Sequence, residues 1–422
     1  MARVLFLTQV LPYPLDAGPK VRAYHMLRHL AGSHEVTLLS FVRGDDPPGS
    51  VSHLRELCRA VHTVPMRRSA WRNVRAAGKG LITGSPMVVA RDEIQEMRAT
   101  VRRLVAESAP EVVHADQLSM AGYGRLAAMA SGSRHRPPRA VLDEHNAIYL
   151  LASRIASVEA RWWRRAIVAR EARAFRRYEA RMCQFYDAIL TVTREDRDHL
   201  LALFAPGERE AASRKFSVVP ICVDPAQVAP VARVTGGPPT ILHLGTMFWP
   251  PNVEGVLWFA REVLPLVHRE APDARFVVVG KNPPDEVIGL TSDPRVEVTG
   301  YVADVGPYLS TADVFVVPLH AGGGMRVKIL DAWLWGQPVV STPIGAEGIE
   351  IRDGENILIG ADAASFAAHV VRLLHDPELN GRIRAAGRTW VETHYVWQAA
   401  YQQVDQVYAR LLSATQGCPS PA

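Results

Sequence analysis

Short apolar runs alternate with longer amphipathic stretches along almost the whole chain. The first half contains the runs VLFLT, VTLLS, EVVHAD, AVLDEH, AILTVT and FSVVP, and the second contains TILHLG, RFVVVG, VEVTG, DVFVVPL and PVVST. These runs are rich in Val, Ile and Leu and are apolar nearly throughout, which is typical of parallel strands buried on both faces. Because the intervening segments have helical spacing, the sequence predicts an α/β fold of doubly wound parallel sheets.

A segment rich in Pro, Gly and Val, residues 225–239, interrupts this pattern. A chain of 422 residues is too long for one ordinary core, so we predict two Rossmann-like domains, 1–224 and 240–394, joined by this linker. The last helical stretch, 395–415, has apolar residues along one face and is predicted to pack back on the first domain. Ligands of open α/β sheets bind beyond the carboxyl ends of the strands, so the cleft between the two domains is the predicted site.

Composition excludes several classes of protein. With 48% hydrophobic and 22% charged residues, the chain is globular and is neither collagen-like nor disordered over long stretches. A net charge of +5 is compatible with an anionic small ligand or surface and does not require nucleic acid. Four widely separated cysteines without metal-ligand spacing favour a reduced, cytoplasmic protein with no metal site. The first apolar run is predicted to be a buried strand and not a signal peptide, and no run is long enough to span a membrane.

The stretch HAGGGMRVKILDAWLWGQPVVST carries the strongest chemical pattern. It contains three consecutive glycines after a predicted strand, Gly322, Gly323 and Gly324. They let the backbone approach a ligand closely, and the helix expected after them would present free N–H groups there. Arg326 and Lys328 add two positive charges, which together suit a pyrophosphate. Asp331, further along the helix, is placed to accept hydrogen bonds from a ribose. Taken alone, such a loop is also compatible with a simple tight turn.

Polar residues end two of the predicted strands in the first half. His114 and Asp116 end one, and Glu144, His145 and Asn146 end the next. A positioned histidine can hydrogen-bond a substrate hydroxyl, and we favour that role for His145, whereas the role of His114 stays open. The alternative is that these residues only cap the following helices, with Asp116 or Asn146 as N-cap.

The first strand-to-helix loop, LPYPLDAGPKVR, combines stiffening prolines with Gly18, which permits an unusual turn. Lys20 and Arg22 follow and would add positive charge near a ligand. The alternative is that both are solvated residues at the start of a helix.

Taken together, these motifs resemble the retaining, nucleotide-sugar-dependent glycosyltransferases of family 4, which have the GT-B fold. The resemblance covers nearly the whole chain. It rests on LPYPLDAGPKVRAYHMLRHLAGSHEVTLLSF, DEHNAIYLLASR, LHLGTMFWPPNVEGVLWF, VTGYVADVGPYLSTADVFVVPL, GGGMRVKILDAWLWGQPVVSTPIGAEGI and the closing VYARLL. The subgroup that it resembles most has a donor loop like Gly-x-Gly-x-Lys-x-Lys-x-x-Glu.

The resemblance implies roles for individual residues, and it also exposes two departures. The family motif has two acids separated by seven residues, of which the second contacts the ribose and corresponds to Asp331. The first acid, which contacts hydroxyls of the donor sugar, corresponds to Gly323 and is therefore missing. The Arg and Lys that most relatives carry in the loop LGTMFWPPNVEG are also missing, and Arg326 and Lys328 are expected to replace their charge.

The complete expected site has three parts. The expected catalytic residues are His145, Arg326 and Lys328. The expected donor-binding residues, which follow predicted strands or match the family loops, are Gly18, Gly245, Thr246, Gly322, Gly323, Gly324, Met325, Asp331, Gly345, Ala346 and Glu347. The expected acceptor-side residues are Lys20, Arg22, His114, Asp116, Glu144 and Asn146.

The function implied by the resemblance is transfer of a sugar from a nucleoside diphosphate sugar, GDP- or UDP-linked, with retention of configuration. The acceptor would be a saccharide, a lipid-linked saccharide or a small biosynthetic metabolite, and no metal or further cofactor is expected. Two alternatives stay open: a nucleotide-sugar epimerase of the same fold, and a catalytically silent nucleotide-sugar-binding protein.

A basic run, residues 160–182, holds eight arginines and two glutamates with Trp162 and Trp163 among them. One interpretation is a helix that lies on an anionic membrane surface. The other is a long solvated helix whose arginines pair with Glu159, Glu171 and Glu179. Binding of nucleic acid is not expected, because no recognisable module is present.

Overall fold

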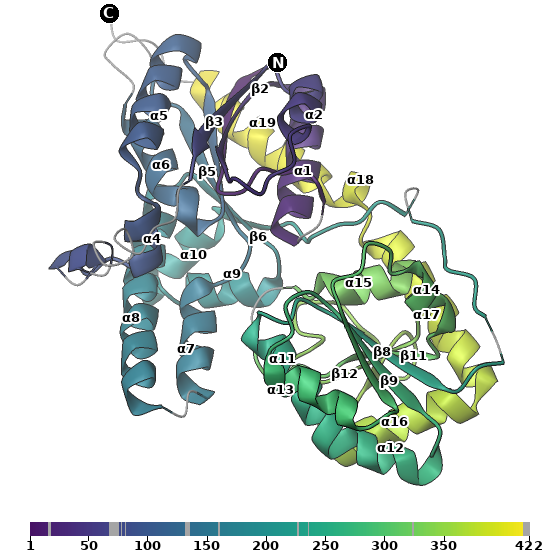
Figure 1. The fold of residues 1–422 in the computed structure, drawn as a ribbon. Helices are drawn as coiled ribbons and strands as arrows, with labels where there is room; N and C mark the ends of the chain where they lie inside the picture. Colours follow the sequence, from purple (N-terminus) through teal and green to yellow (C-terminus); the bar gives the residue numbers. More distant parts are fainter. Residues whose placement is uncertain are drawn as a thin grey trace, which may run out of the picture. The chain divides into compact units, whose positions relative to one another are not determined.

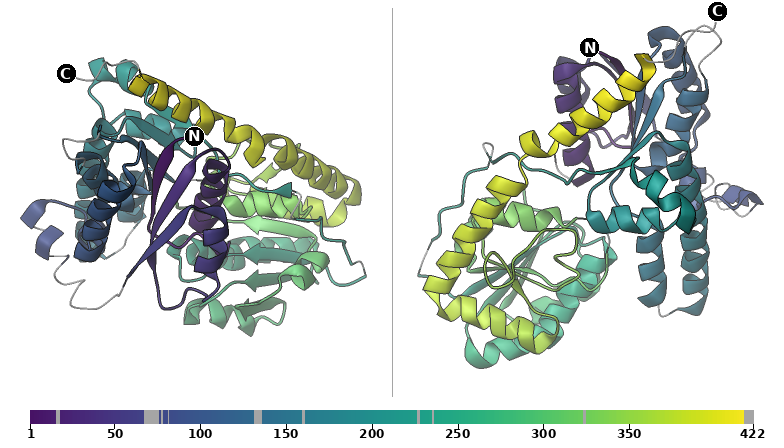
Figure 2. Two further views of the ribbon diagram at one scale, coloured as in Figure 1. Left: turned by 90° about the horizontal axis from the view of Figure 1, so that it is seen from above. Right: turned by 180° about the vertical axis from the view of Figure 1, so that it is seen from behind.

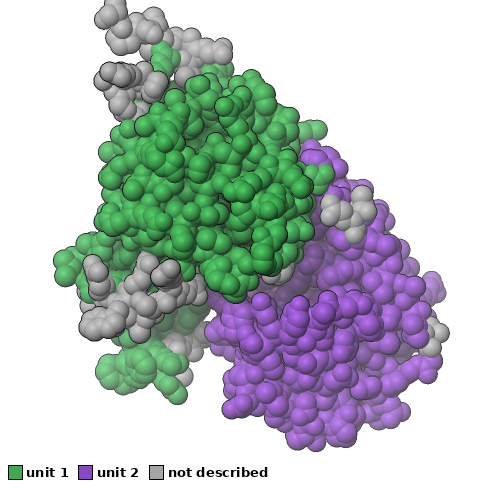
Figure 3. All heavy atoms as spheres, turned by 45° about the horizontal axis from the view of Figure 1, so that its top comes forward, with its two compact units in different colours: residues 1–221, 400–422 green, residues 222–399 purple. Residues whose placement is uncertain are grey.

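The computed structural model describes residues 1–15, 18–66, 76, 78–80, 82–130, 136–158, 161–225, 228–234, 236–322 and 325–416. The chain forms two compact units, shown in different colours in Figure 3. Unit 1 consists of Met1–Ile221 and Ala400–Ala422, and unit 2 of Cys222–Ala399. Among the described residues, no helix combines the length and the apolar composition that crossing a membrane requires.

Unit 1 is built on a seven-stranded sheet in the order β3-β2-β1-β4-β5-β6-β7. All neighbouring strands pair in parallel, as predicted. The strands are β1 (Arg3–Thr8), β2 (Glu35–Val42), β3 (Ala60–Pro65), β4 (Val112–Asp116), β5 (Arg139–Glu144), β6 (Ala188–Thr191) and β7 (Phe216–Val218). Since β1 and β4 are neighbours in the sheet but not in the sequence, the order of the strands reverses between them.

Helices cover both faces of this sheet (Figures 1 and 2). The helices of unit 1 are α1 (Gly18–Ser33), α2 (Ser50–Leu57), α4 (Met87–Asp92), α5 (Gln95–Ser108), α6 (Leu118–Met129), α7 (Ile148–Val158), α8 (Trp162–Phe185), α9 (Arg194–Leu201), α10 (Arg209–Ser213) and α19 (Gln402–Gln416). One buried cluster joins Leu5 and Leu7 of β1 to side chains of α5, α6 and α8. On the other face, α1 and α2 lie beside the C-terminal helix α19 (Figure 2).

Unit 2 has a six-stranded parallel sheet in the order β10-β9-β8-β11-β12-β13. Its strands are β8 (Thr240–Leu244), β9 (Arg275–Val279), β10 (Val296–Gly300), β11 (Val314–Val317), β12 (Val339–Ser341) and β13 (Leu358–Ile359). Its helices are α11 (Pro250–Trp258), α12 (Leu264–Glu270), α13 (Asp285–Ile288), α14 (Gly306–Thr311), α15 (Val327–Leu334), α16 (Ala363–His375), α17 (Pro377–His394) and α18 (Trp397–Ala400), the last of which ends on the boundary with unit 1.

The segment 225–239, predicted as a linker, packs along unit 2. Its backbone N–H groups at Val231 and Val234 donate to the carbonyls of Trp335 and Ser310, at 3.0 and 2.8 Å. The side chain of Arg233 pairs with Asp313, which directly precedes β11. The units divide after Ile221 and after Ala399, compared with the predicted division around 225–239 and at 395.

Helix α17 fixes helix α15 through a close contact at Gly387. A Cβ atom at Gly387 would lie 2.4 Å from Cδ1 of Trp333, which is fully buried on α15. The indole N–H of Trp333 donates to the carbonyl of Asn356 at 3.0 Å. The glycine therefore lets α15, which carries predicted site residues, approach α17 closely.

Two glycines of α17 offer a test of this contact. We expect Gly387→Ala to lower the free energy of unfolding of unit 2 by about 1–3 kcal/mol, because the added methyl group overlaps Trp333. At exposed Gly381 nothing lies within 4 Å of an added Cβ atom. We expect Gly381→Ala to raise the free energy of unfolding by up to about 1 kcal/mol, because alanine has the higher helix propensity. Chemical denaturation of the two variants measures both effects, and equal effects would show that the Trp333 contact is unimportant.

Candidate functional site

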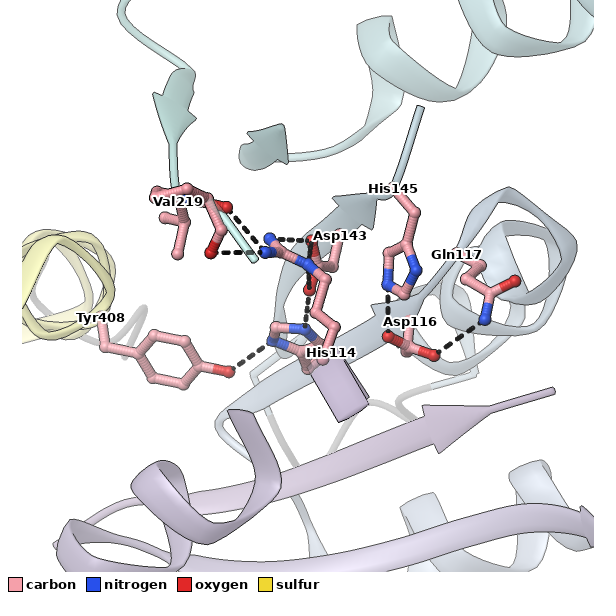
Figure 4. A network of polar contacts seen from close by, with 9 residues as sticks. His114, Asp116, Gln117, Asp143, His145, Val219 and Tyr408 are labelled. Carbon is pink, nitrogen blue, oxygen red and sulfur yellow. Dashed lines mark hydrogen bonds and ion pairs between the residues drawn. The ribbon is translucent and has the colours of Figure 1, made fainter. Parts of the chain in front are cut away.

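Charged side chains gather in unit 1 where β4 and β5 end, next to the point at which the strand order reverses (Figure 4). His114 and Asp116 belong to β4, Asp143 to β5, and His145 follows β5 directly. The carboxyl ends of parallel strands at such a reversal are where open α/β sheets bind ligands.

The centre of this cluster is a buried ion pair between Arg22 of α1 and Asp143. Nη2 of Arg22 lies 2.6 Å from Oδ1 of Asp143, and Nε lies 3.0 Å from both carboxylate oxygens. Nη1 donates to the carbonyls of Val219 at 2.6 Å and Pro220 at 3.2 Å. Burial alone would raise the pKa of Asp143, but the charge of Arg22 and a hydrogen bond from His114 outweigh it and lower the pKa. Both side chains are 0% exposed, so we interpret Arg22 as a structural cation and not as an acceptor contact.

His114 is also an interior residue. Its Nδ1 lies 2.9 Å from Oη of Tyr408 on α19, and its Nε2 lies 3.8 Å from Oδ2 of Asp143. Its ring stacks on Phe6 of β1 with 4.6 Å between the ring centroids. The side chain is fully buried and ties the C-terminal helix to the sheet, which favours a structural role.

His145 and Asp116 form a hydrogen-bonded pair at the edge of the cluster. Nε2 of His145 lies 2.9 Å from Oδ1 of Asp116, whose side chain is fully buried, whereas the imidazole is 10% exposed. If Nε2–H donates to the carboxylate, a neutral His145 keeps the Nδ1 lone pair for another partner. A buried carboxylate thus orients an accessible imidazole, an arrangement suited to hydrogen bonding or proton transfer at a hydroxyl group.

Gln117 adds an unusual backbone conformation beside this pair. Its φ is +71°, rare for a residue other than glycine, and its side-chain amide lies 3.5 Å from Oδ2 of Asp116. Such strain is often found at functional sites. Gln117 is not among the predicted site residues, because nothing in the local sequence pattern marks a positive φ at that position.

Glu144 lies among other acids in the interior. Burial raises its pKa well above the usual range, and the charges of Glu179, Asp143 and Asp196 raise it further. Glu179 accepts hydrogen bonds from the N–H groups of Ile148 and Tyr149, at 2.6 and 3.0 Å, and burial raises its pKa to about 8. Because its side chain is buried among these groups, we interpret Glu144 as a structural residue and not as an acceptor contact.

Asp116 and Asn146 do not cap the following helices, as the alternative interpretation proposed. Gln117 is the N-cap residue of α6, and its side chain makes no capping hydrogen bond. Asp196 accepts a hydrogen bond from the N–H of Ala147 at 2.9 Å, and Glu179 accepts one from the N–H of Ile148, the first residue of α7. Asn146 is half-buried, and within the described chain its Oδ1 has no hydrogen-bond partner.

The first strand-to-helix loop is described only in part. Gly18 is the first residue of α1, and Lys20 is half-buried in its first turn. Residues 16 and 17 lie outside the described residues. Both Gly18 and Lys20 stay predictions as ligand contacts.

Asp116, Asp143 and His145 also bring one possible ligand atom each within 4.8 Å of one another, a spacing that suits a metal ion. Arg22 already neutralises Asp143, and His145 already engages Asp116. We therefore interpret the three residues as members of two separate pairs, Arg22–Asp143 and Asp116–His145, and not as a cation site.

Replacing the arginine tests the buried ion pair. We expect Arg22→Met to cost about 3–5 kcal/mol at neutral pH, because it leaves the Asp143 carboxylate buried without its cation. The low pKa of Asp143 means that the pair stabilises the folded state above the unfolded pKa of about 3.9 and that this stability is lost as the pH falls through the folded value. The difference between wild type and variant should therefore be largest above about pH 4 and should shrink as the pH falls below it, which denaturant titrations at several pH values measure.

The matched control is the double variant Arg22→Met/Asp143→Asn, which removes the stranded charge. It is expected to be more stable than Arg22→Met alone at neutral pH. A pH-independent loss of the same size in both variants would mean that Arg22 acts through packing and not through charge.

In unit 2 the strand order reverses between β8 and β11, and Lys328 lies there on the first turn of α15. Its Nζ donates to Oδ1 of Asn252 at 2.9 Å, and Nδ2 of Asn252 donates to the carbonyl of Thr246 at 2.9 Å. A Cβ atom at Gly245 would lie 2.9 Å from Nζ of Lys328, so only glycine leaves room for the ammonium group. Asn252 thus joins the predicted residues Gly245, Thr246 and Lys328 into one cluster.

His243 lies beneath this cluster and was not predicted, because it sits inside an apolar strand. Its Nδ1 lies 3.0 Å from the carbonyl of Val316, and within the described residues its buried Nε2 has no hydrogen-bond partner. Burial, followed by the charge of Lys328, lowers its pKa to about 3. The ring is therefore neutral and adds no charge to the cluster.

Arg326 directly precedes α15, which begins at Val327 and so starts later than predicted. Arg326 is buried, and its guanidinium lies over Gly322, where a Cβ atom would be 2.5 Å from Nη2. Gly322 has a φ of +143°, which favours glycine, and Met325 is buried. Gly323 and Gly324, predicted to contact the donor, lie outside the described residues.

The charges on α15 are poorly neutralised. Burial, and then the nearby charge of Arg326, lowers the pKa of Lys328 to about 7. Burial raises the pKa of half-buried Asp331 to about 7. A cation whose charged form is disfavoured in this way is stabilised when an anion binds beside it. Lys328, Arg326 and the start of α15 can therefore hold an anionic group such as a diphosphate.

The loop after β12 lies next to β11 at the same end of the sheet. The N–H of Gly345 donates to Oγ1 of Thr342 at 2.9 Å, and a Cβ atom at Gly345 would be 2.6 Å from the carbonyl oxygen of Val317. Ala346 is buried and Glu347 half-buried. The three predicted residues Gly345, Ala346 and Glu347 thus form a tight turn at the carboxyl end of the sheet.

Comparisons with known proteins agree on one family. Residues 17–213 match the family described as "Glycosyl transferase 4-like domain", and residues 238–376 match "Glycosyl transferases group 1". An "Uncharacterized 44.6 kDa protein in cps region" of Klebsiella pneumoniae is 30% identical over 145 residues, 31% of this chain and 36% of that protein. A phosphatidyl-myo-inositol mannosyltransferase of Mycobacterium tuberculosis is 28% identical over 214 residues, 48% of this chain and 56% of that protein. These alignments thus span between about a third and just over half of the relatives' lengths.

Among solved structures, HepE of Anabaena in complex with UDP and glucose matches with a TM-score of 0.64 and 12% identity. The match covers 97% of this chain and all of that one. At this identity the likeness concerns the fold, and it agrees with the GT-B architecture expected from the sequence.

Proposed function

The chain belongs to the family 4 glycosyltransferases, and on that premise we propose that it transfers a sugar from a nucleoside diphosphate sugar to an acceptor with retention of anomeric configuration. The observation that carries the proposal is the cluster around Lys328. Its ammonium group lies above Gly245, is held by Asn252, and shares the start of α15 with Arg326.

The donor diphosphate is proposed to bind at this cluster. Arg326 can contact phosphate oxygens with its planar guanidinium, and Lys328 adds a point charge. The first turn of α15 supplies backbone N–H groups. Asp331 lies about one helical turn after Lys328 on α15. We expect its carboxylate to accept hydrogen bonds from the ribose hydroxyls.

In the proposed reaction, the bond between the anomeric carbon and the diphosphate oxygen breaks, and the acceptor atom attacks from the same face. The acceptor proton passes to a phosphate oxygen of the leaving group, so no protein nucleophile takes part. Arg326 and Lys328 stabilise the negative charge that develops on the diphosphate, a role that a divalent metal ion fills in other enzymes. Activity that survives a chelator would support this assignment.

His145 is proposed to hydrogen-bond a sugar hydroxyl in this reaction. Asp116 orients its imidazole through the 2.9 Å hydrogen bond to Nε2, which fixes the ring and leaves Nδ1 for the substrate. Asp116 is thus proposed as a positioning residue. Arg22, His114 and Glu144 are buried and are not proposed to contact the substrate.

For the nucleotide and the acceptor we propose chemical classes and not single compounds. UDP is favoured by the structure of HepE, which is a complex with UDP and glucose, and GDP, the other nucleotide expected from the sequence, stays an alternative. The acceptor is proposed to be a saccharide, a lipid-linked saccharide or a small metabolite. Because Gly323 replaces the acid expected to contact donor hydroxyls, an unusual donor sugar is part of the proposal.

A catalytically silent nucleotide-sugar-binding protein is the second candidate, and the same replacement at Gly323 favours it. The two candidates share the diphosphate site and differ in turnover. Release of free nucleoside diphosphate from a bound donor in the presence of acceptors would support the transferase. Tight binding without release under all conditions would support the silent protein.

Nucleotide binding tests the diphosphate site directly. We expect one of UDP, GDP, ADP and TDP to raise the denaturation temperature, because a ligand of the native state stabilises it by mass action. Arg326→Ala and Lys328→Ala should each weaken binding by about tenfold or more, since hydrogen bonds to charged groups contribute about 1.5–3 kcal/mol. Arg382→Ala, an exposed change on α17 of the same charge, is the control and should leave binding unchanged. Full affinity in both site variants would place the diphosphate elsewhere.

Proton uptake tests the role of Lys328. At about pH 8 the unliganded lysine, with its pKa of about 7, is mostly neutral, and a bound diphosphate should raise that pKa and draw in a proton. Affinity should therefore fall as the pH rises above about 7. Calorimetry in buffers with different ionisation enthalpies measures this uptake, which Lys328→Met should abolish.

Asp331 titrates over the same range, so a matched comparison separates the two groups. Asp331→Asn is expected to keep the uptake, and the double variant Lys328→Met/Asp331→Asn to lose it. Undiminished uptake in the double variant would assign the proton to a group other than Lys328.

A further inference from the structure

Helices α7 and α8 form a hairpin in unit 1, side by side in Figures 1 and 2. Residues 161–167, at the start of α8, are exposed on every side of the helix. They include Trp162, which is 80% exposed, Trp163, which is 46% exposed, and Ile167, which is 47% exposed. Three large apolar side chains at the end of one hairpin form an apolar surface that water solvates poorly.

Arginines continue from this apolar end along the solvent face of α8. Arg173, Arg177 and Arg181 follow at four-residue intervals, so they lie on one face of the helix. Arg164 and Arg165 lie in the first turn, where Cζ of Arg164 lies over the ring of Trp163, 5.2 Å from its centroid. The hairpin therefore combines exposed aromatic rings with a row of positive charges.

The glutamates on α8 do not neutralise these arginines. Glu171 pairs with Arg170 and accepts from the backbone N–H of Met87 at 2.7 Å. Glu179 accepts from two backbone N–H groups at the start of α7. Glu159, the third acid considered from the sequence, lies outside the described residues. Within the described chain, no carboxylate pairs with five of the arginines, Arg164, Arg165, Arg173, Arg176 and Arg177.

A groove of about 480 Å³ runs between α7, α8 and the end of α9. Its apolar lining includes Ala156, Ala169, Ala172 and Leu203, and Arg173 and Arg176 also line it. An apolar floor beside two guanidinium groups is complementary to a molecule with a hydrocarbon part and a phosphate group.

We propose that this hairpin surface, formed by residues 161–167 and the arginines up to Arg181, docks on an anionic lipid membrane. Trp162, Trp163 and Ile167 enter the boundary between headgroups and acyl chains, where tryptophan is favoured. The arginines contact lipid phosphates. A nucleic acid or an acidic protein would also attract the arginines, but neither would explain Ile167 and the apolar groove, which lipid covers.

Vesicle binding by the full chain tests the proposal. Co-sedimentation is expected with vesicles of phosphatidylcholine and phosphatidylglycerol, much less with phosphatidylcholine alone, and less at high salt. Arg173→Gln/Arg177→Gln should weaken binding by roughly tenfold or more, since each arginine near an anionic surface contributes about 1 kcal/mol, or about fivefold. Arg269→Gln/Arg382→Gln, two exposed arginines of unit 2, is the matched control for charge and should bind as wild type does.

A second measurement follows the aromatic rings. Lipids brominated on the acyl chain should quench part of the tryptophan fluorescence, and Trp162→Phe/Trp163→Phe should abolish that quenching. Surface substitutions of this kind rarely change stability, and an unchanged denaturation temperature checks that the variants fold.

Three results would overturn the proposal. They are equal binding to neutral and anionic vesicles, arginine variants that bind as tightly as the control, and quenching that survives in the tryptophan variant. Tighter binding to duplex DNA than to anionic vesicles, lost in the same arginine variants, would assign the surface to nucleic acid. None of these results bears on the diphosphate site, which nucleotide binding tests separately.

Discussion

The buried ion pair of Arg22 and Asp143 is the interaction on which unit 1 depends. It joins helix α1 to strand β5 and, through the carbonyls of Val219 and Pro220, to the segment that leaves β7. Removing two charges from water is costly, and the cost is offset only when geometry and hydrogen bonds are nearly complete. With Asp143 engaged in this way, Asp116 on the neighbouring strand is left to orient His145.

The charged side chains on α15 of unit 2 contrast with this completed ion pair, and the contrast supports the proposed diphosphate site. The lysine on α15 is held by the neutral amide of Asn252, and both it and Asp331 have pKa values near 7, far from their usual ranges in opposite directions. In unit 1 the pKa of the central carboxyl group is lowered, as expected for a completed pair. A structural cation has its counter-ion within the fold, whereas a binding cation receives it from the ligand.

The sequence predicted most of the fold but less of the site. Each apolar run became a strand, because strands buried on both faces leave a clear pattern. Strand β3 was not predicted because it is an edge strand whose residues are mostly half-buried or exposed. Strand β13 was not predicted because it has only two residues. The predicted polar residues do lie at the carboxyl ends of strands. The sequence could not distinguish Arg22 from Lys328, since the partner of Arg22 lies 121 residues away and only the folded chain brings them together. The same limit hid Asn252 and Gln117, whose roles come from tertiary contacts and backbone conformation.

Helix α8 connects two features of unit 1 that the sequence treats as unrelated. Its C-terminal half is part of the core through Tyr178, Met182 and Cys183, whereas its first two turns are exposed. Glu179, on the buried half, accepts the N–H groups of Ile148 and Tyr149, only three and four residues after His145. Because a helix is stiff along its axis, the side chain that fixes the loop after β5 and the arginines of the exposed hairpin belong to one rigid element. Through Glu179, the loop that carries His145 is thus attached to the same helix that carries the basic surface.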